Sequence, residues 1–281
     1  MRLLLLRFFL VCVGLDPLLA TAAHSVTRVI YSAGEVAGER RYDDMIETLC
    51  TALEKTRAQF GPYECRSDGL IQPKKRVVQN LETGHTGLSV IWNPTSAEKE
   101  KQFAAIKVEL RKNMLGYRVA LIRREDQEKF NHVRTAADLR AFAVGQGAGW
   151  NDNTVYQSSG IPLVTGQYGQ LFQMLAAKRF DLLPRSVIEI SPELLVARQI
   201  SPDLVVEKNL LIYYPMPYYF FVNKRDTALK TRLETGLNMM QKDGSLEAIF
   251  NKYHAAEIEK LDLKHRRLIR LSNPTLPGPY Q

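Results

Sequence analysis

The sequence predicts an α/β protein of two units, and three observations support this prediction. The 281 residues are 45% hydrophobic and 24% charged, which is typical of globular domains and excludes disordered chains, collagen-like repeats and small disulfide scaffolds. Strand-like and helix-like patterns alternate along the chain. The alternation restarts after residues 115–117 and again after residues 214–217, where glycine or proline interrupts it.

Residues 1–23 are expected to be an export signal. They combine a short basic start, an apolar stretch and small residues that suit cleavage after Ala22 or Ala23. An uncleaved membrane anchor is the alternative, but Arg7 and Asp16 make the apolar stretch poor at spanning lipid. We therefore expect an exported protein whose mature part begins near residue 24.

The first unit is expected to have the order β-α-β-α-β. Met45, Leu49 and Leu53 fall near one face of a helix, and Gly61 ends that helix. The expected elements are a strand over 26–31, a helix over 42–60, a strand over 63–66, a helix over 73–82 and a strand over 88–92.

The second unit repeats the alternation, and the chain then adds one strand and two helices. Gly244 separates these helices, and the tail over 267–281 is expected to lie along the surface. Alternating strands and helices imply mainly parallel sheets. The expected elements are strands over 117–122, 143–144, 162–164, 180–183, 205–212 and 218–222, and helices over 135–142, 151–158, 168–178 and 186–198.

Two cysteines, Cys50 and Cys65, remain in the mature chain. An even number in an oxidising compartment favours a disulfide, and a ring of about 16 residues would stabilise the fold by roughly 3 kcal/mol. Two buried free thiols are the alternative, because the sequence does not give the Cα separation.

The charge gives no indication of a nucleic-acid partner. The chain has 38 Lys and Arg against 30 Asp and Glu, and removal of the signal leaves about +7. The densest basic groups, 74–76, 123–124 and 264–267, belong to no recognisable nucleic-acid module. We expect solvated faces with some attraction to anionic solutes or to a membrane surface.

No common catalytic or cofactor motif is present. The five His lack metal-site spacing, and neither a GxSxG elbow nor a phosphate loop occurs. In the glycine-rich loop over 144–150, Trp150 replaces the third glycine of a dinucleotide fingerprint. The loop could still present backbone N–H groups to a carboxylate beside an aromatic wall; a tight turn with Trp150 covering the sheet edge is the alternative. We expect no enzyme, metal or cofactor.

Several segments and their order resemble a known family. The segments are GYRVALIRR, VGQGAGW, RFDLLPRSVIEI and KDGSLEAIFNKYH. With the export signal and the two α/β units, they resemble bacterial extracytoplasmic solute-binding proteins of the type II periplasmic binding fold. Among these, the sequence is similar to a divergent branch of the family 3 (polar amino acid) binding proteins of ABC importers. The resemblance covers nearly all of the mature chain.

This resemblance implies two lobes that close by hinge motion on a small solute in the cleft between them. The two crossing segments would lie near 115–117 and 214–218. The implied organisation is a signal over 1–23, the first part of lobe 1 over 24–115, lobe 2 over 116–215, and a return to lobe 1 with a C-terminal tail over 216–281. The implied protein is a periplasmic monomer that presents its solute to an ABC permease or a membrane sensor.

The sequence departs from the family at both ends of the expected ligand. Family members hold the ligand carboxylate with an Arg after the third lobe-1 strand, but the matching stretch, 95–100, has no Arg, and Lys99 could make only a point-charge contact. The acidic residue that receives the ligand amino group is matched near Arg185, and a cation there would repel an ammonium group. A carboxylate, another anion or a peptide-like ligand is therefore as compatible with the sequence as a free amino acid.

Candidate ligand-binding residues follow from strand ends that would face the cleft. Arg185 is expected to bind a ligand carboxylate or phosphate; the alternative is a structural pair with Asp181 or Glu189. Arg118 could point into the cleft or away from it. The candidates are Tyr31, Ser32, Trp92, Thr95, Arg118, Trp150, Asp152, Arg185 and Glu189.

The sequence favours a solute-binding protein without chemistry, for a solute that is anionic or amino-acid-like. One alternative is a periplasmic, dehydratase-like enzyme on the same fold, for which Glu189 or Asp152 would be the acid or base. The other alternative is an envelope protein-interaction module that has lost transport.

Overall fold

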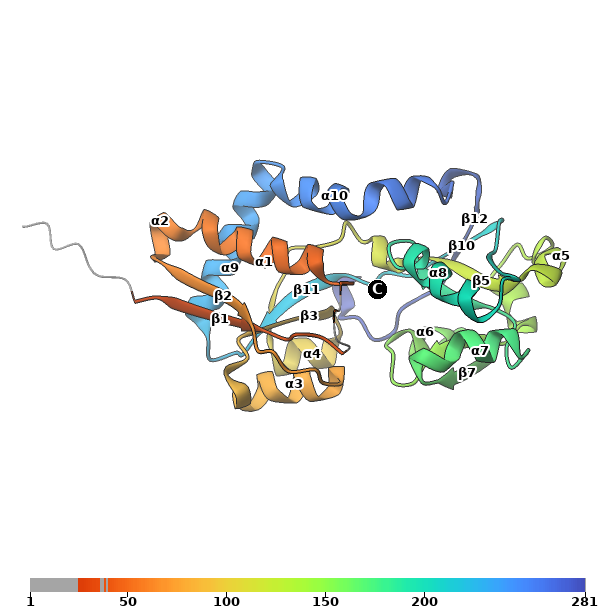
Figure 1. The fold of residues 1–281 in the computed structure, drawn as a ribbon, viewed down its shortest axis with the longest axis horizontal. Coiled ribbons are helices and arrows are strands. Elements are labelled where there is room, and N and C mark those ends of the chain that lie inside the picture. Colours follow the sequence, from red (N-terminus) through yellow and green to blue (C-terminus); the bar gives the residue numbers. More distant parts are fainter. Residues whose placement is uncertain (1–24, 36–37, 39, 281) are drawn as a thin grey trace, which may run out of the picture.

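The computed structural model describes residues 25–35, 38 and 40–280, and it folds into two lobes side by side (Figure 1). The expected export signal, with its cleavage point at Ala22 or Ala23, lies outside the described residues. Within the described part, no helix is long and apolar enough to cross a membrane.

Lobe 1 contains two small sheets covered by helices. The strands β1 (Thr27–Tyr31) and β2 (Tyr63–Ser67) are parallel, whereas β3 (Val90–Pro94), β11 (Tyr218–Val222) and β4 (Ala104–Ile106) form an antiparallel sheet with β11 in the centre. The helices of this lobe are α1 (Asp43–Lys55), α2 (Arg57–Phe60), α3 (Lys74–Thr83), α4 (Ala97–Gln102) and α9 (Thr227–Lys242).

Lobe 2 is organised around β5 (Tyr117–Arg123), the strand with the most neighbours. It pairs antiparallel with β8 (Leu183–Ser186), β9 (Leu204–Val206) and β10 (Leu210–Tyr213), while β6 (Val144–Gly147) and β7 (Leu163–Gly166) form a separate parallel pair. The helices of this lobe are α5 (Gln127–Phe130), α6 (Asp152–Ser158), α7 (Leu171–Ala176) and α8 (Ile190–Ile200).

The expected α/β fold of two lobes is confirmed, but the expectation of mainly parallel sheets is wrong. The strands next to the crossing, β5 and β10, pair antiparallel, because β5 carries the chain into lobe 2 and β10 carries it out. The same applies to β11, which returns to lobe 1 beside β3 and β4. The helix expected over 135–142 is reduced to a single 3₁₀ turn, Asp138–Ala141.

The two crossing segments contact each other through their backbones. The N–H of Tyr214 donates to the carbonyl of Gly116 at 3.2 Å. A Cβ on Gly116 would lie 2.3 Å from the Tyr214 carbonyl oxygen, so only glycine allows this approach. Tyr214 also belongs to a continuous core that joins Leu49 of lobe 1 to Leu182 of lobe 2.

The C-terminal part of the chain links the lobes a second time. The helix α10 (Ser245–Glu259) runs above both lobes in Figure 1. It begins with Leu246 in the core shared with lobe 1, and Leu261, just beyond its end, is buried in the core of lobe 2.

The strand β12 (Arg267–Arg270) then joins the sheet of lobe 2 by parallel pairing with β10. From there the chain returns to lobe 1, where the N–H of Ala97 donates to the carbonyl of Thr275 at 2.9 Å. The tail expected along the surface is thus part of both lobes.

The expected disulfide is present in the structure. Cys50 on α1 is bonded to Cys65 on β2, with a Cα–Cα separation of 6.0 Å. The bond fastens the first long helix of lobe 1 to the neighbouring sheet. It agrees with an oxidising location for this lobe.

The close backbone contact at the crossing predicts that an added methyl group lowers the stability of the protein at Gly116 but not at Gly278. We expect Gly116→Ala to lower the free energy of unfolding by about 1–3 kcal/mol, because the new Cβ forces the crossing segments apart. Gly278→Ala is the matched control, since no atom lies within 4 Å of the added Cβ. Urea unfolding of both variants checks this; equal stabilities would contradict the close approach.

Candidate functional site

A cavity of about 600 Å³ lies between the lobes and receives side chains from both. Four of its lining residues are aromatic, and the others include carboxylates, arginines and apolar side chains. Pockets of this size and mixture are typical of small-molecule sites. The lining residues used below are Tyr42, Asp44 and Arg111 from lobe 1, Trp150, Tyr168, Glu189 and Glu193 from lobe 2, and His254 from α10.

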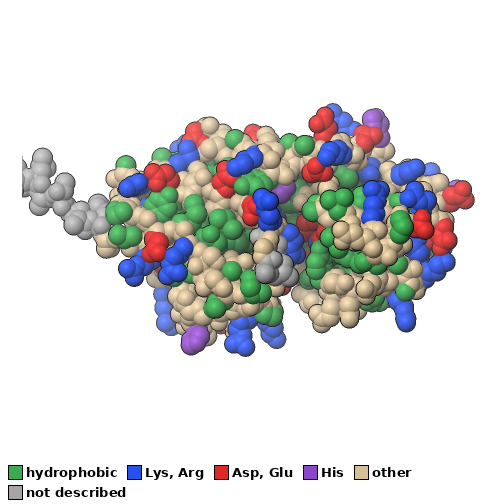
Figure 2. Space-filling view, viewed as in Figure 1, with side chains coloured by type: hydrophobic (Ala, Val, Ile, Leu, Met, Phe, Trp, Pro, Cys, Tyr) green, Lys and Arg blue, Asp and Glu red, His purple; other side chains and the backbone are tan. Residues whose placement is uncertain are grey.

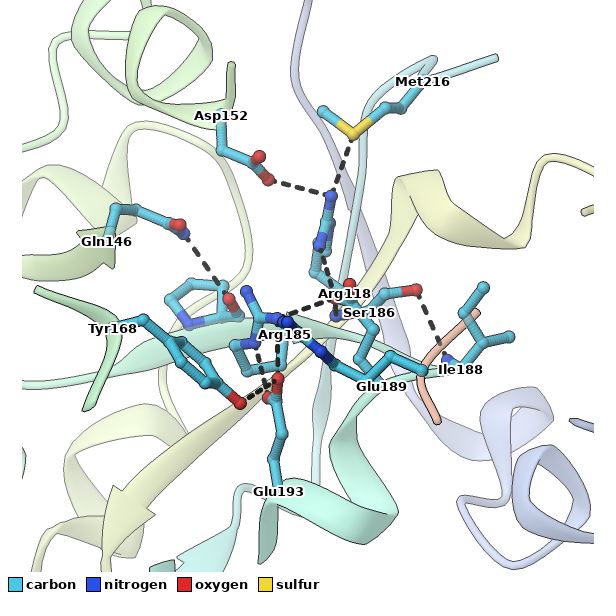
Figure 3. A network of polar contacts seen from close by, with 12 residues as sticks. Arg118, Gln146, Asp152, Tyr168, Arg185, Ser186, Ile188, Glu189, Glu193 and Met216 are labelled. Atoms are coloured by element: carbon cyan, nitrogen blue, oxygen red, sulfur yellow. Dashed lines mark hydrogen bonds and ion pairs between the residues drawn. The ribbon is translucent and has the colours of Figure 1, made fainter. Parts of the chain in front are cut away.

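The lobe-2 wall is built on Arg185, whose guanidinium is paired inside the protein (Figure 3). Its Nε and Nη2 donate to the two oxygens of Glu193 at 2.5 and 2.7 Å, and Nη2 lies 3.1 Å from Glu189 Oε2. Its Cζ lies 4.4 Å from the ring centroid of Trp150. The residue is only 4% exposed. Arg185 was expected either to bind a ligand anion or to pair with a carboxylate of the protein, and in the structure it forms such a pair. Its main partner is Glu193, and Glu189 is the second.

Arg118 joins this wall to the crossing segment. Its Nη2 lies 2.9 Å from Asp152 Oδ1 and 3.0 Å from the sulfur of Met216, and its Nη1 lies 3.4 Å from Glu189 Oε2. Tyr214 also donates its hydroxyl to Asp152. Arg118 therefore points inward, toward the cleft side of lobe 2, but its guanidinium is held by protein groups.

The glycine-rich loop places Trp150 on the cavity wall. The indole lies directly over Gly147, where a Cβ would be 2.1 Å from the ring. Its other neighbours are Arg185 and the ring of Tyr168, whose centroid is 6.0 Å away. Trp150 and Glu189 line the cavity, as the sequence predicts, whereas Arg118, Asp152 and Arg185 lie behind them.

The lobe-1 candidates lie beside a second, smaller pocket of about 40 Å³. Ser32 and Trp92 line it together with Lys74 and Tyr42. Tyr42 lines both pockets, so the two are neighbours.

Two further lobe-1 candidates line neither pocket. Tyr31 packs on Trp92 with ring centroids 6.0 Å apart. Thr95 is buried and donates its hydroxyl to Glu100 Oε1 at 2.8 Å.

Two sets of interacting side chains on the cavity wall are not among the residues predicted from the sequence. Arg111 donates to both oxygens of Asp44 at 2.8 and 2.7 Å, and His254 Nε2 lies 2.9 Å from Asp44 Oδ2. Tyr168 donates its hydroxyl to Glu193 at 3.0 Å. The members of each group are far apart in the sequence, so no local pattern could have joined them.

Buried pairing keeps these carboxylates ionised. Burial alone would raise the pKa of Asp44, but Arg111 and the hydrogen bond with His254 lower it to about 2. Burial would likewise raise the pKa of Glu189, yet the guanidinium groups of Arg185 and Arg118 hold it below its usual range. Asp44 and Glu189 therefore present fixed negative charges on the wall.

Lobe 1 also brings two lysines together. Lys74 lines the smaller pocket, and its ammonium lies 3.5 Å from the Tyr42 hydroxyl. Burial, and to a smaller extent the neighbouring Lys74, lower the pKa of Lys99 to about 8. Among the described residues, Lys99 forms no ion pair. On the face shown in Figure 2, side chains of both charge signs occur on both lobes.

Comparisons with known proteins support the fold. No model of a protein family matches the chain, and no curated protein matches it. Solved structures do match. A Salmonella typhimurium periplasmic binding protein with high arginine specificity has a TM-score of 0.56 and 15% identity, over 82% of this chain and 100% of that one.

Two other solved structures extend the comparison. An ancestral amino-acid-binding protein, described as a precursor of cyclohexadienyl dehydratase, has a TM-score of 0.55 and 14% identity, over 82% of this chain and 95% of that one. A histidine kinase sensor domain with similarity to periplasmic binding proteins has a TM-score of 0.53 and 16% identity, over 82% and 96%. The chain thus has the two-lobe fold of periplasmic binding proteins, as its sequence resemblance implies.

The Asp44–Arg111 pair predicts a specific loss of acid stability. Because the pKa of Asp44 is about 2 in the folded protein and about 3.9 when unfolded, its stabilisation is complete above pH 4 and disappears as the pH falls toward 2. We expect Asp44→Asn to cost about 3 kcal/mol at pH 7, because Arg111 loses its buried partner. The difference from wild type should shrink below pH 4.

Asp43→Asn is the control for this prediction, because the ion-pair partner of Asp43 within the described part of the chain is the exposed Arg40. Urea unfolding at pH 7, 4 and 3 measures both variants. A constant difference between wild type and Asp44→Asn at all three pH values would contradict the prediction.

Proposed function

We propose that this protein is an exported receptor that binds a small polar solute in the interlobe cavity and presents it to an ABC importer or a membrane sensor. The observation that carries the proposal is the cavity itself, whose walls come from both lobes and from α10. A solute there contacts both lobes at once, so its binding favours the closed arrangement. The structural neighbours include a periplasmic binding protein and a sensor domain, which agrees with either destination.

The solute is proposed to be anionic, with its anionic group at lobe 1. Lys74 lines the smaller pocket with Ser32 and Trp92, and Lys99 is its neighbour, since burial and the charge of Lys74 both lower the pKa of Lys99. An anion between them relieves their mutual repulsion and supplies Lys99 with a partner. This role replaces the expected role of Arg185, which is already paired with Glu193.

The enzyme alternative receives no specific support. A general acid or base works best with a pKa near the operating pH, but the pKa of Glu189 is held below its usual range by Arg185 and Arg118. Asp152, the other candidate, is buried and bound by Arg118 and Tyr214.

Binding should depend on pH through Lys99. Because the pKa of Lys99 is about 8, an anionic solute should bind more weakly as the pH rises from 7 to 9, and its binding near pH 8 should take up protons. Lys99→Gln should weaken binding roughly tenfold, the loss of about one charge-assisted contact. Lys101→Gln, an exposed change on the same helix, should leave it unchanged. Calorimetry at pH 7, 8 and 9 measures the affinity of wild type and of both variants. An affinity of wild type that does not change with pH would contradict the role of Lys99.

The binding function itself is tested on mature protein freed of co-purified solutes. Amino acids, dicarboxylates, phosphates and short peptides are screened by thermal unfolding. A true ligand at about 100 times its Kd adds about 2.7 kcal/mol, a shift of roughly 5–10 °C for a chain of this length. The same ligand should change the fluorescence of Trp150, one of two tryptophans, and Trp150→Phe should remove that change. No shift with any compound would favour the alternative of an envelope interaction module.

A further inference from the structure

Arg185 sits in an enclosure with the chemistry of a guanidinium receptor. Two carboxylates, Glu189 and Glu193, hold its nitrogens at 2.5–3.1 Å, with Glu193 in the bidentate arrangement. Trp150 and Tyr168 provide aromatic faces at 4.4 and 5.9 Å from Cζ. Paired carboxylates and aromatic faces are the groups that recognise a planar cation.

The enclosure opens onto the cavity, although Arg185 itself does not line it. All four enclosing residues, Trp150, Tyr168, Glu189 and Glu193, belong to the cavity wall. Arg185 comes from β8 and lies among these four residues (Figure 3), but it is not part of the cavity lining itself. A receptor that faces the cavity is thus filled by a side chain of the protein.

The filling changes the charge that lobe 2 presents to a solute. Arg118 and Arg185 together offset two of the three negative charges on Asp152, Glu189 and Glu193. Burial alone would lower the pKa of Arg185, but Glu189 and Glu193 raise it well above its usual value, so the guanidinium remains charged. Both oxygens of Glu193 and the Oε2 of Glu189 are occupied by it.

We propose that Arg185 is a tethered occupant of the lobe-2 cation receptor and excludes solutes that direct a guanidinium or ammonium group toward lobe 2. The inference rests on the proposed function, because it concerns the solute of the same cavity. It assigns the solute class: an anionic group toward lobe 1 and an uncharged group toward Trp150 and Tyr168. Arg185 is accordingly a specificity-determining residue that acts by filling the receptor.

The test removes the tethered guanidinium and offers a free one. Methylguanidinium is added to Arg185→Ala, and N-methylurea, a neutral compound of similar shape, serves as the control ligand. We expect methylguanidinium to raise the Tm of this variant saturably, by roughly 5–10 °C at about 100 times its Kd, and to change Trp150 fluorescence. N-methylurea should do neither.

The matched control variant is Arg123→Ala. Arg123 is also buried in lobe 2, where it binds Asp126 at 2.5 Å and the carbonyls of Leu175 and Phe180, but it does not border the cavity. Wild type and Arg123→Ala should show no saturable response. If Arg185→Ala is unstable on its own, its refolding yield with methylguanidinium is compared with the yield with N-methylurea, and Arg123→Ala is treated in the same way.

Three results of the methylguanidinium test would overturn the inference. Arg185→Ala could fail to respond to methylguanidinium, it could respond equally to N-methylurea, or wild type could show the same saturable response to methylguanidinium. The solute screen on wild type is independent of these outcomes. If methylguanidinium binds to Arg185→Ala but no compound binds to wild type, the proposed function is wrong and the inference about Arg185 is retained. If wild type binds a ligand that carries a cation, and Trp150→Phe weakens that binding, the proposed function is retained and the inference about Arg185 is wrong.

Discussion

The ion pair between Arg185 and Glu193 is the interaction on which the character of the cavity depends. A guanidinium that is only 4% exposed needs hydrogen-bond partners that offset the cost of its desolvation, and for Arg185 these partners are carboxylates. Once Glu193 and Glu189 satisfy it, the lobe-2 wall has little charge left for a solute. In the proposed function, recognition by charge therefore belongs to lobe 1, where Lys74 and Lys99 are neighbours, and lobe 2 contributes the flat surfaces of Trp150 and Tyr168.

The same network reaches the crossing segment. Arg118 contacts Glu189 on the cavity side and Met216 on the crossing segment, while Asp152 receives the hydroxyl of Tyr214. The cavity wall and the crossing segment are thus joined by direct contacts through a single side chain. Under the proposed function, this contact is the physical route by which a solute at Glu189 would act on the crossing segment.

Local patterns in the sequence were sufficient for most helices and strands. The strand β1 lies within one residue of its expected bounds, and the helix expected over 42–60 is present as α1 and α2, interrupted at Thr56. Amphipathic spacing and β-branched runs are short-range signals. The order of such elements predicted two α/β units, and the family resemblance implied the two-lobe fold. The strand β12 was missed because it is stabilised by pairing with β10, more than fifty residues earlier. Among the residues predicted from strand ends, Trp150 and Glu189 lie on the cavity wall. The pairing of Arg111 with Asp44 spans 67 positions, so no local sequence pattern indicates it.

The path of the last residues has a consequence for how the molecule is made. Synthesis runs from the N-terminus, and domains commonly fold as they emerge. Here neither lobe can be completed early, because lobe 1 needs β11, α9 and the Thr275 contact, and lobe 2 needs α10 and β12. Until β12 arrives, the edge of β10 remains open to pairing with other chains. The edge of β10 is therefore exposed in every folding intermediate in which β12 is not yet paired.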